Sequence, residues 1–229
     1  MGDVKEKIKK GLIVSCQALP EEPLHSSFIM GRMAIAAVSS GAIGIRANTA
    51  EDIKEIQNNV TVPIIGIKKK VYGDCPVFIT PTLNEMREIA DTGVEIVACD
   101  ATLRPRPDGK DLTEVVTQFK KEYPNTLLMA DCATIAEVKN ACEIGFDFVG
   151  TTLHGYTAET KGMNVADDDF AFLKEVLANA TKPVIAEGKV DTPAKAKRVL
   201  DLGCHAVVVG GAITRPQEIT KRFVDEIKN

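Results

Sequence analysis

The sequence contains no tryptophan, and only 5% of its 229 residues are aromatic. Hydrophobic residues nevertheless make up 45% of the chain, so valine, isoleucine, leucine and alanine must fill its core. A chain of this length buries roughly 70% of the surface that it would expose when extended. We therefore expect one domain, residues 1–229, with an aliphatic core.

Long hydrophobic runs and concentrated positive charge are also missing. No apolar run approaches the ~20 residues that span a bilayer, and the opening "MGDVKEKIKKG" is charged where a signal peptide is apolar. The net charge is −4, and basic and acidic residues are interspersed rather than gathered in a basic stripe. These absences predict a cytoplasmic protein with neither a membrane nor nucleic acid as its partner.

Paired cysteines are absent as well. The six cysteines form no CxxC pair, and Cys16, Cys99 and Cys132 lie in or beside hydrophobic runs typical of strands. We therefore expect buried free thiols that behave as small apolar residues.

Short β-branched runs alternate with longer stretches of helical periodicity. The predicted strands are residues 12–16, 42–47, 63–67, 95–100, 126–131, 146–152, 183–188 and 205–211. The predicted helices are residues 27–40, 49–59, 83–93, 111–123, 134–145, 167–180, 192–203 and 216–227. A further short strand is expected at 76–80. The alternation predicts an α/β fold, a single (β/α)₈ TIM barrel. A doubly wound open sheet is the alternative, although no GxGxxG motif follows the first strand.

Polar residues stand at the end of almost every predicted strand. In a barrel these ends share one rim, where active sites lie, so the residues are expected to surround one pocket. They are Gln17, Arg46, Lys69, Asp100, Asp131, Thr152 and Glu187, with Gly210 and Gly211 after the last strand.

The third strand ends in three consecutive lysines, and side-chain alternation decides which one faces the barrel interior. If Ile65 and Ile67 point inward, Lys69 does too, whereas the opposite alternation would place Gly66 and Lys68 inside. The residues alone leave both arrangements open.

The loops after the last two strands have the composition of a phosphate site. Gly188, Gly210 and Gly211 let the backbone approach a ligand closely, while Lys189 and Arg215 supply cationic donors. The segment from Thr214 to Pro216 opens a helix, whose free N–H groups attract an anion. We therefore expect a phosphate at this end of the pocket.

No pattern favours a metal or an organic cofactor. His154 could in principle share a metal with Asp100, Asp131 or Glu187, but no HxH or HxxxH spacing supports such a site. No segment marks an NAD, flavin or pyridoxal site. We expect neither metal nor cofactor.

Several segments in order along the chain resemble the N-acetylmannosamine-6-phosphate 2-epimerases. The most specific are "SCQAL" (15–19) and "HSSFIMGRMA" (25–34), and others are "PIIGIKK" (63–69), "TTLHGYT" (151–157) and "GGAITRP" (210–216). The resemblance implies a cytoplasmic isomerase of sialic acid catabolism, built on a barrel. Its substrate would be N-acetylmannosamine 6-phosphate, its product N-acetylglucosamine 6-phosphate, and its oligomeric state a homodimer.

The same resemblance implies roles for individual residues. Lys69 falls on the family's catalytic lysine and Glu187 on its active-site glutamate. Gln17, Arg46 and Asp131 fall on residues that hold the sugar, and Arg215 on the phosphate arginine. Lys189 departs from the family, because it stands where an arginine is expected.

The implied chemistry needs these residue types. Inverting C2 of the open-chain sugar requires a base that removes the proton beside the C1 aldehyde, and positive charge that stabilises the enolate. A lysine can serve only when it is partly neutral, and moving its pKa from ~10.4 towards ~7 takes about 4–5 kcal/mol. Burial and a cation such as Arg46 act in that direction, whereas Glu187 and Asp131 oppose it.

Two other functions fit the residues. A strand-end lysine facing a sugar phosphate could form a Schiff base, as in an aldolase. A barrel that binds the sugar phosphate without turning it over could act as a sensor. The C-terminal helix, with Ile219, Phe223 and Ile227 on one face, could either pack on the barrel or join a partner.

Overall fold

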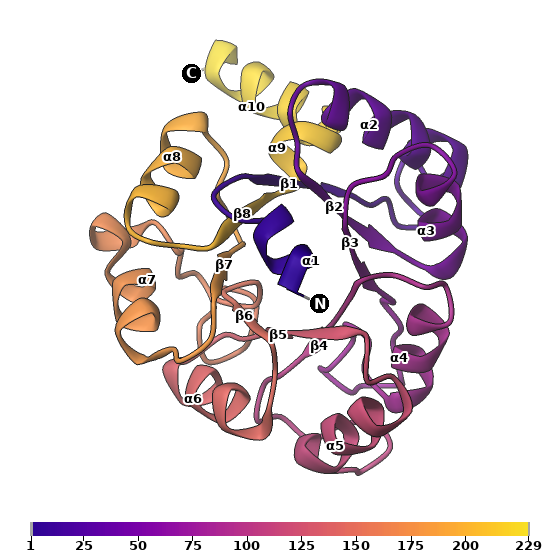
Figure 1. Cartoon of the computed structure of the whole chain (residues 1–229). Coiled ribbons are helices and arrows are strands. Elements are labelled where there is room, and N and C mark those ends of the chain that lie inside the picture. Colours follow the sequence, from indigo (N-terminus) through magenta and orange to yellow (C-terminus); the bar gives the residue numbers. More distant parts are fainter. Residues whose placement is uncertain (1, 229) are drawn as a thin grey trace.

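The computed structural model describes residues 2–228 and shows eight parallel strands that close into a barrel (Figure 1). The strands follow one another around the barrel in chain order, and β8 closes it by pairing with β1. The predicted (β/α)₈ barrel is confirmed, and the open doubly wound sheet is excluded.

The strands are β1 (Leu12–Cys16), β2 (Gly44–Asn48), β3 (Ile64–Ile67), β4 (Ile96–Asp100), β5 (Leu127–Asp131), β6 (Phe148–Gly150), β7 (Val184–Ala186) and β8 (Ala206–Val209). The helices are α1 (Gly2–Lys7), α2 (Ser27–Ser39), α3 (Ala50–Gln57), α4 (Leu83–Ala90), α5 (Leu112–Glu122), α6 (Ile135–Ile144), α7 (Asp167–Asn179), α8 (Pro193–Asp201), α9 (Gly211–Thr214) and α10 (Pro216–Lys228).

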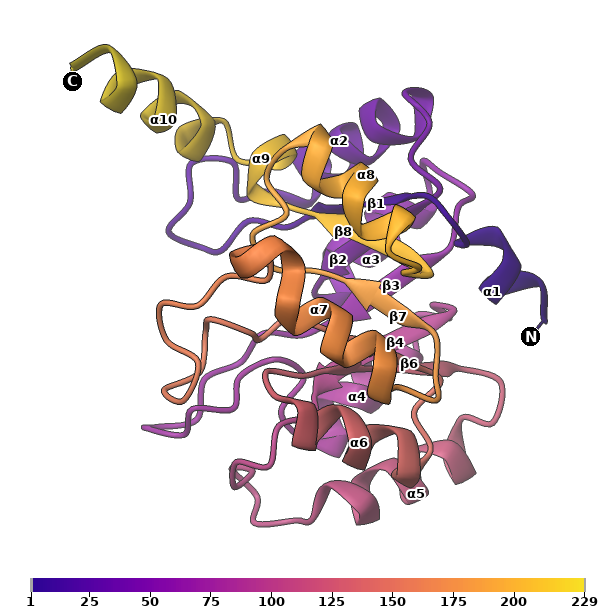
Figure 2. The ribbon, with the colours of Figure 1, turned by 90° about the vertical axis from the view of Figure 1, so that its left-hand side faces the viewer.

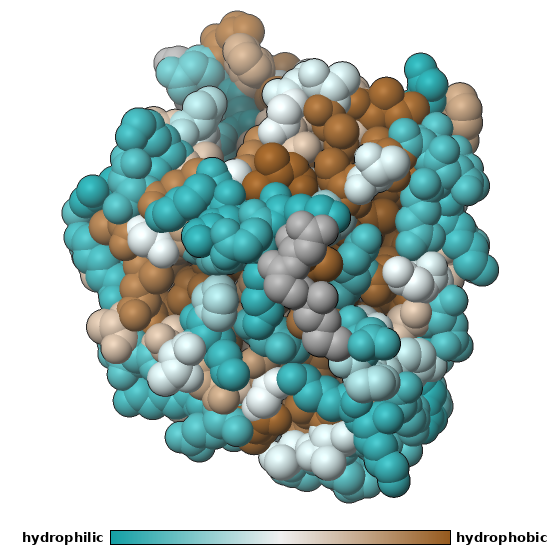
Figure 3. All heavy atoms as spheres, viewed as in Figure 1, coloured by the Kyte–Doolittle hydropathy of each residue, from teal (hydrophilic) through white to brown (hydrophobic). Residues whose placement is uncertain are grey.

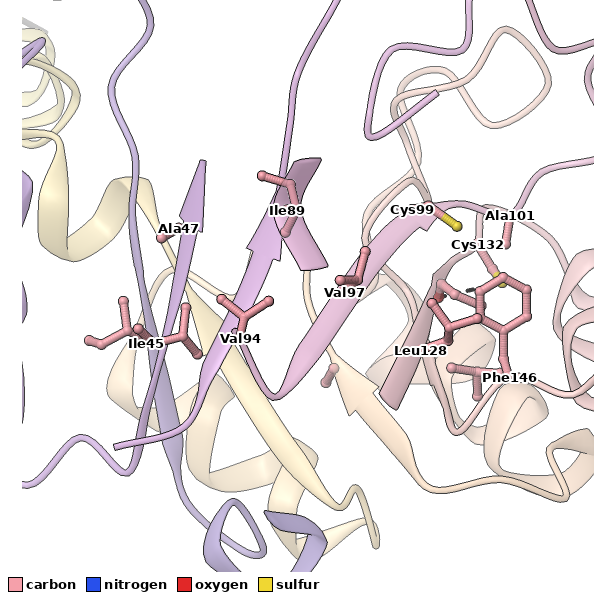
Figure 4. Close-up of a cluster of buried hydrophobic side chains, with 14 of the residues drawn as sticks. Ile45, Ala47, Ile89, Val94, Val97, Cys99, Ala101, Leu128, Cys132 and Phe146 are labelled. Atoms are coloured by element: carbon pink, nitrogen blue, oxygen red, sulfur yellow. Dashed lines mark hydrogen bonds between the residues drawn. The ribbon is translucent and has the colours of Figure 1, made fainter. Parts of the chain in front are cut away.

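The core has two layers, because successive side chains of a strand point to opposite faces. One layer fills the barrel interior and includes Ile13, Ile65, Ile67 and Phe148. The other lies between strands and helices, where Figure 4 shows Val97 of β4, Leu128 of β5 and neighbouring side chains. All six cysteines are free, and Cys16, Cys99 and Cys132 are buried as expected.

Gly66 fixes the alternation along β3. A Cβ atom at Gly66 would lie 2.5 Å from Cγ2 of Ile89 on α4 and 2.9 Å from Cδ1 of Ile53 on α3, so this position faces the helices. Ile65 and Ile67 therefore face the interior. The alternation then directs Lys69 towards the barrel axis as well.

Helix α1 covers the N-terminal end of the barrel and lies at the centre of the ring in Figure 1. Ile8, just after this helix, is fully buried and packs in the interior layer, against which Val4 also packs. The ring Nε2 of His205 lies 2.8 Å from the carbonyl oxygen of Lys5. This short helix was not predicted from the sequence.

The predicted strand 76–80 is absent, and three predicted strands, 146–152, 183–188 and 205–211, each run two residues too far at the C-terminal end. In residues 76–80 only Ile79 pairs, through a single antiparallel bridge to Lys69, because Thr80 turns the chain with a φ of 45°. The predicted strand 205–211 ends at Val209, because Gly211 already begins the short helix α9.

Helix α10 extends away from the barrel, at the end opposite α1 (Figure 2). None of its residues is buried, and Phe223 and Ile227 are 68% and 83% exposed. It therefore does not pack on its own barrel, which excludes one of the two arrangements considered from the sequence. Among the described helices, none has the length and apolarity needed to cross a membrane.

Candidate active site

A cavity of about 580 Å³ opens at the C-terminal ends of the strands. Seven of the predicted site residues line it: Lys69, Thr152, Glu187, Gly188, Gly210, Gly211 and Arg215. The other three are buried: Gln17 lies directly after β1, Arg46 within β2 and Asp131 at the end of β5. Ser15 also lines the cavity and was missed, although it lies two residues before Gln17 and therefore on the same side of the strand.

A buried ion-pair network lies among the ends of β2, β5 and β7. The guanidinium of Arg46 donates from Nη2 to Oδ2 of Asp131 at 2.5 Å and from Nη1 to Oδ1 at 3.2 Å. Its Nη1 also lies 3.0 Å from Oε2 of Glu187. Arg46 and Asp131 have side-chain exposures of only 1% and 0%. One cation is therefore shared between two carboxylates, and its pair with Asp131 is shielded from water.

Glu187 is held beside this network. Its backbone N–H donates to Oγ1 of Thr151 at 3.0 Å, and the Thr152 hydroxyl lies 3.2 Å from its Oε2 and 2.7 Å from Oδ1 of Asp131. Burial raises the pKa of Glu187 to about 7; Arg46 opposes this rise and Asp131 adds to it. Glu187 can therefore gain or lose a proton near neutral pH.

Lys69 projects into the cavity from the end of β3. Its backbone N–H donates to Oδ1 of Asn48 at 2.8 Å, and its backbone pairs with Ile79. Burial lowers its pKa to about 8, helped by the charges of Arg215 and Arg46 and opposed by those of Glu187 and Glu22. At pH 7 roughly a tenth of this lysine is then neutral, and neutral amines are competent bases.

The two neighbouring lysines point elsewhere. The ammonium of Lys68 contacts Oε1 of Glu88 on α4, and that of Lys70 lies 2.9 Å from Oε1 of Glu85. Both therefore face the surrounding helices. The sequence left open which lysine faces the barrel interior, and the structure shows that it is Lys69.

Two further polar residues predicted at the rim, Gln17 and Asp100, have different hydrogen-bond partners. Gln17 donates from Nε2 to Oγ of Ser15 at 2.7 Å, while its buried Oε1 lacks a hydrogen-bond partner within the described residues. Asp100, expected in the polar ring, instead accepts hydrogen bonds from Thr102 and from Arg104, the latter at 2.6 Å. Asp100 therefore stabilises its own loop and does not line the cavity.

The end of the cavity after β7 and β8 contains the glycines and cations predicted to bind phosphate. Gly188 has a φ of +98°, a conformation that favours glycine. Arg215 reaches the cavity while two of its nitrogens bind Glu22, a contact that sequence reasoning missed. Lys189 lines the cavity, but its ammonium donates to the carbonyl of Met163 at 2.9 Å.

His154 has a structural role. Its ring stacks on Phe172 with 3.6 Å between ring centroids, and its Nδ1 lies 2.9 Å from the carbonyl oxygen of Ala133. Across residues 2–228, no three His, Cys, Asp or Glu side chains are arranged to hold a metal ion.

Comparison with known proteins identifies close relatives along nearly the whole chain. A family model described as putative N-acetylmannosamine-6-phosphate epimerase matches residues 30–229. A putative N-acetylmannosamine-6-phosphate 2-epimerase of Listeria monocytogenes serovar 1/2a is 64% identical over 225 residues, covering 98% of this chain and 95% of the relative. One from Lactiplantibacillus plantarum is 62% identical over 220 residues, covering 96% of each.

Solved structures agree with this result. The N-acetylmannosamine-6-phosphate 2-epimerase from Clostridium perfringens superposes with a TM-score of 0.92 at 49% identity, covering 96% of this chain and 95% of that one. A thiamine phosphate pyrophosphorylase from Pyrococcus furiosus, 13% identical with a TM-score of 0.59, shares the fold alone. From the family match and the identities above, the chain belongs to the N-acetylmannosamine-6-phosphate 2-epimerase family.

Proposed function

We propose that this protein is an isomerase that inverts C2 of N-acetylmannosamine 6-phosphate to give N-acetylglucosamine 6-phosphate. One observation carries the proposal: Lys69, whose pKa is lowered to about 8, shares a cavity with Glu187 and Arg215. A base, a titratable carboxyl group and a phosphate-binding cation are the groups that this reaction needs. The cavity volume of about 580 Å³ also suits a small ligand.

In the proposed mechanism, neutral Lys69 removes the C2 proton of the open-chain sugar. The electrons of the broken C–H bond form the C1–C2 double bond, and negative charge develops on O1. Glu187, with a pKa near 7, exchanges a proton with that oxygen or orients the group that does. After the enolate turns its other face towards Lys69, the protonated lysine returns a proton to that face of C2 and the proton on O1 passes back to Glu187. The C1 carbonyl is then restored and the inversion is complete.

The remaining site residues hold the sugar. Gln17 offers the unpartnered Oε1, and Thr152 offers a hydroxyl beside Glu187. Arg46 pairs with the carboxylate of Glu187, and Asp131 holds the guanidinium of Arg46 in place. Gly188, Gly210, Gly211 and Arg215 surround the phosphate. In this reading the enzyme serves amino-sugar and sialic acid catabolism, as its family resemblance implies.

The experiment that tests the function follows the reaction by proton NMR in D₂O, without added metal. We expect the product signals to grow while deuterium replaces the C2 proton, because a lysine exchanges its protons with solvent. Conversion without exchange would contradict proton transfer through a solvent-accessible Lys69. Binding without conversion would contradict the isomerase, and an adduct then trapped by borohydride would favour Schiff-base chemistry instead.

We also propose that the protein forms a homodimer through α10. Ile219, Phe223 and Ile227 recur every fourth residue and so share one face of this helix, and the last two are largely exposed. A groove of about 320 Å³ lies beside α2, lined mostly by apolar side chains such as Val14, Met33 and Ala37. Figure 3 shows hydrophobic surface on both α10 and the neighbouring α2. In the proposed dimer, the apolar face of α10 from one copy packs into this groove of the other copy.

The dimer is tested by sedimentation equilibrium. We expect a mass near twice 24.7 kDa for the unmodified protein and near 24.7 kDa for Phe223→Glu, because a charge cannot be buried in an apolar groove. Lys221→Glu, on the opposite face of α10, is the matched control and should stay dimeric. A Phe223→Glu variant that kept the dimer mass would place the interface elsewhere. The cytoplasmic location and the lack of a nucleic-acid partner stay predictions.

A further inference from the structure

Glu22 makes an extensive polar contact that the mechanism above does not use. It lies in the loop between β1 and α2, far along the chain from Arg215. Its carboxylate accepts hydrogen bonds from Nε and Nη2 of Arg215 at 2.6 and 3.2 Å, from Nε2 of Gln217 at 3.0 Å, and from the backbone N–H of Leu19 at 2.7 Å. These contacts tie the first loop of the barrel to the last.

The contact leaves one edge of the Arg215 guanidinium available. Arginine has five N–H donors in a rigid planar fork. Glu22 takes the edge formed by Nε and Nη2, while Nη1 has no hydrogen-bond partner within residues 2–228. Because Arg215 also lines the cavity, its free donors are available to a ligand there.

We propose that Glu22 is a positioning residue for the phosphate of the substrate, which it serves by holding Arg215 in its binding orientation. The inference rests on the proposed function in one respect, namely that a phosphorylated sugar occupies the cavity. Because Glu22 already holds the side chain of Arg215, that side chain loses less conformational entropy when phosphate binds. The same contacts between Arg215 and phosphate then give a higher affinity. Glu22 is itself held by the backbone of Leu19 and by Gln217, which makes it a fixed support.

Glu22 also acts on Lys69 through charge. Burial lowers the pKa of Lys69 most; among the nearby charges, Arg215 and Arg46 lower it further, and Glu187 and Glu22 raise it. Removing the charge of Glu22 leaves Arg215 with only its longer contact to Glu218, whose Oε1 lies 3.6 Å from Nε of Arg215. The positive charge of Arg215 is then less neutralised, so the pKa of Lys69 should fall below its value of about 8. Activity that needs neutral Lys69 rises with pH through this pKa. The acidic limb of the curve of activity against pH should therefore move to lower pH.

The test is Glu22→Gln, with Glu21→Gln as the matched control in the same loop. Glu21 is exposed, and the described residues give it no hydrogen bond or ion pair. For Glu22→Gln we expect KM for N-acetylmannosamine 6-phosphate to rise about tenfold, and kcat to change less. A tenfold loss of affinity is what the loss of one charge-assisted hydrogen bond typically causes. The acidic limb of kcat/KM should move to lower pH, and Glu21→Gln should change neither quantity.

Calorimetric titration with inorganic phosphate separates this inference from the proposed function, because it needs no turnover. Weaker phosphate binding by Glu22→Gln supports the positioning role even if the unmodified protein were inactive on the sugar. Tighter phosphate binding would overturn it, since Glu22 would then compete with the ligand for Arg215. Unchanged binding and an unmoved pH limb would also overturn it. Glu22→Asp, which keeps the charge, should keep the limb in place and gives a second variant if Glu22→Gln folds poorly.

Discussion

Lys69→Ala is expected to lower kcat/KM for N-acetylmannosamine 6-phosphate by about 10²–10⁴-fold, the usual contribution of a positioned acid–base group. The side chain lies in the cavity, and burial with two nearby arginines lowers its pKa to about 8. Alanine can neither take nor return the C2 proton. The loss is measured by following product formation, and deuterium incorporation at C2 should fall in parallel.

Lys68→Ala is the matched control for this change. Lys68 is the preceding residue, but its ammonium pairs with Glu88 on α4 and points away from the cavity. Both side chains are partly exposed to water, at 26% and 38%, and an ion pair near the surface contributes about 0–1 kcal/mol to stability. Activity should therefore stay close to that of the unmodified enzyme. If Lys69→Ala kept most of its activity, or Lys68→Ala lost it, the assignment of the base would be wrong.

Asp131→Ala is expected to lower the free energy of unfolding by about 3–5 kcal/mol, as breaking a buried ion pair typically does. Asp131 and its partner Arg46 are almost completely shielded from water, and two hydrogen bonds join them. Without Asp131, the buried guanidinium keeps only Glu187 as a countercharge. Urea unfolding followed by circular dichroism measures the loss.

Substitution of an exposed aspartate is the control for Asp131→Ala. Asp201 pairs with Lys197 on α8, and their side chains are 51% and 76% exposed. Asp201→Ala should therefore change stability by less than about 1 kcal/mol, because water and salt weaken such a pair. A similarly small loss for Asp131→Ala would mean that Glu187 alone balances the charge of Arg46.

The barrel and most of its polar rim could be predicted because each rests on a local pattern. The two-residue alternation left Lys68 and Lys69 as candidates for the barrel interior, and the family resemblance selected Lys69, which the position of Gly66 confirms. The end of each apolar run located Arg46, Asp131 and Glu187. The network that joins these three could not be predicted. Whether two carboxylates share one guanidinium depends on the register of strands that lie far apart in sequence.

The missed features lack any local pattern. Helix α1 spans six residues and is stabilised by packing of Val4 and Ile8 at the barrel end, which is a tertiary effect. Glu22 is one charged residue in a polar loop, and only closure of the barrel brings it to Arg215. Residues 76–80 had the composition of a short strand, yet they form only one antiparallel bridge, between Ile79 and Lys69.

Closure of the barrel's N-terminal end by α1 and Ile8 bears on how the enzyme exchanges its ligands. Sugar that enters the cavity at the C-terminal rim must leave by the same entrance. The two sugars differ only in the configuration at C2 and carry the same phosphate, so the phosphate site proposed around Arg215 would bind both. Product is therefore a competitor of substrate at every turn, and the net direction of flux depends on how quickly the next reaction removes it.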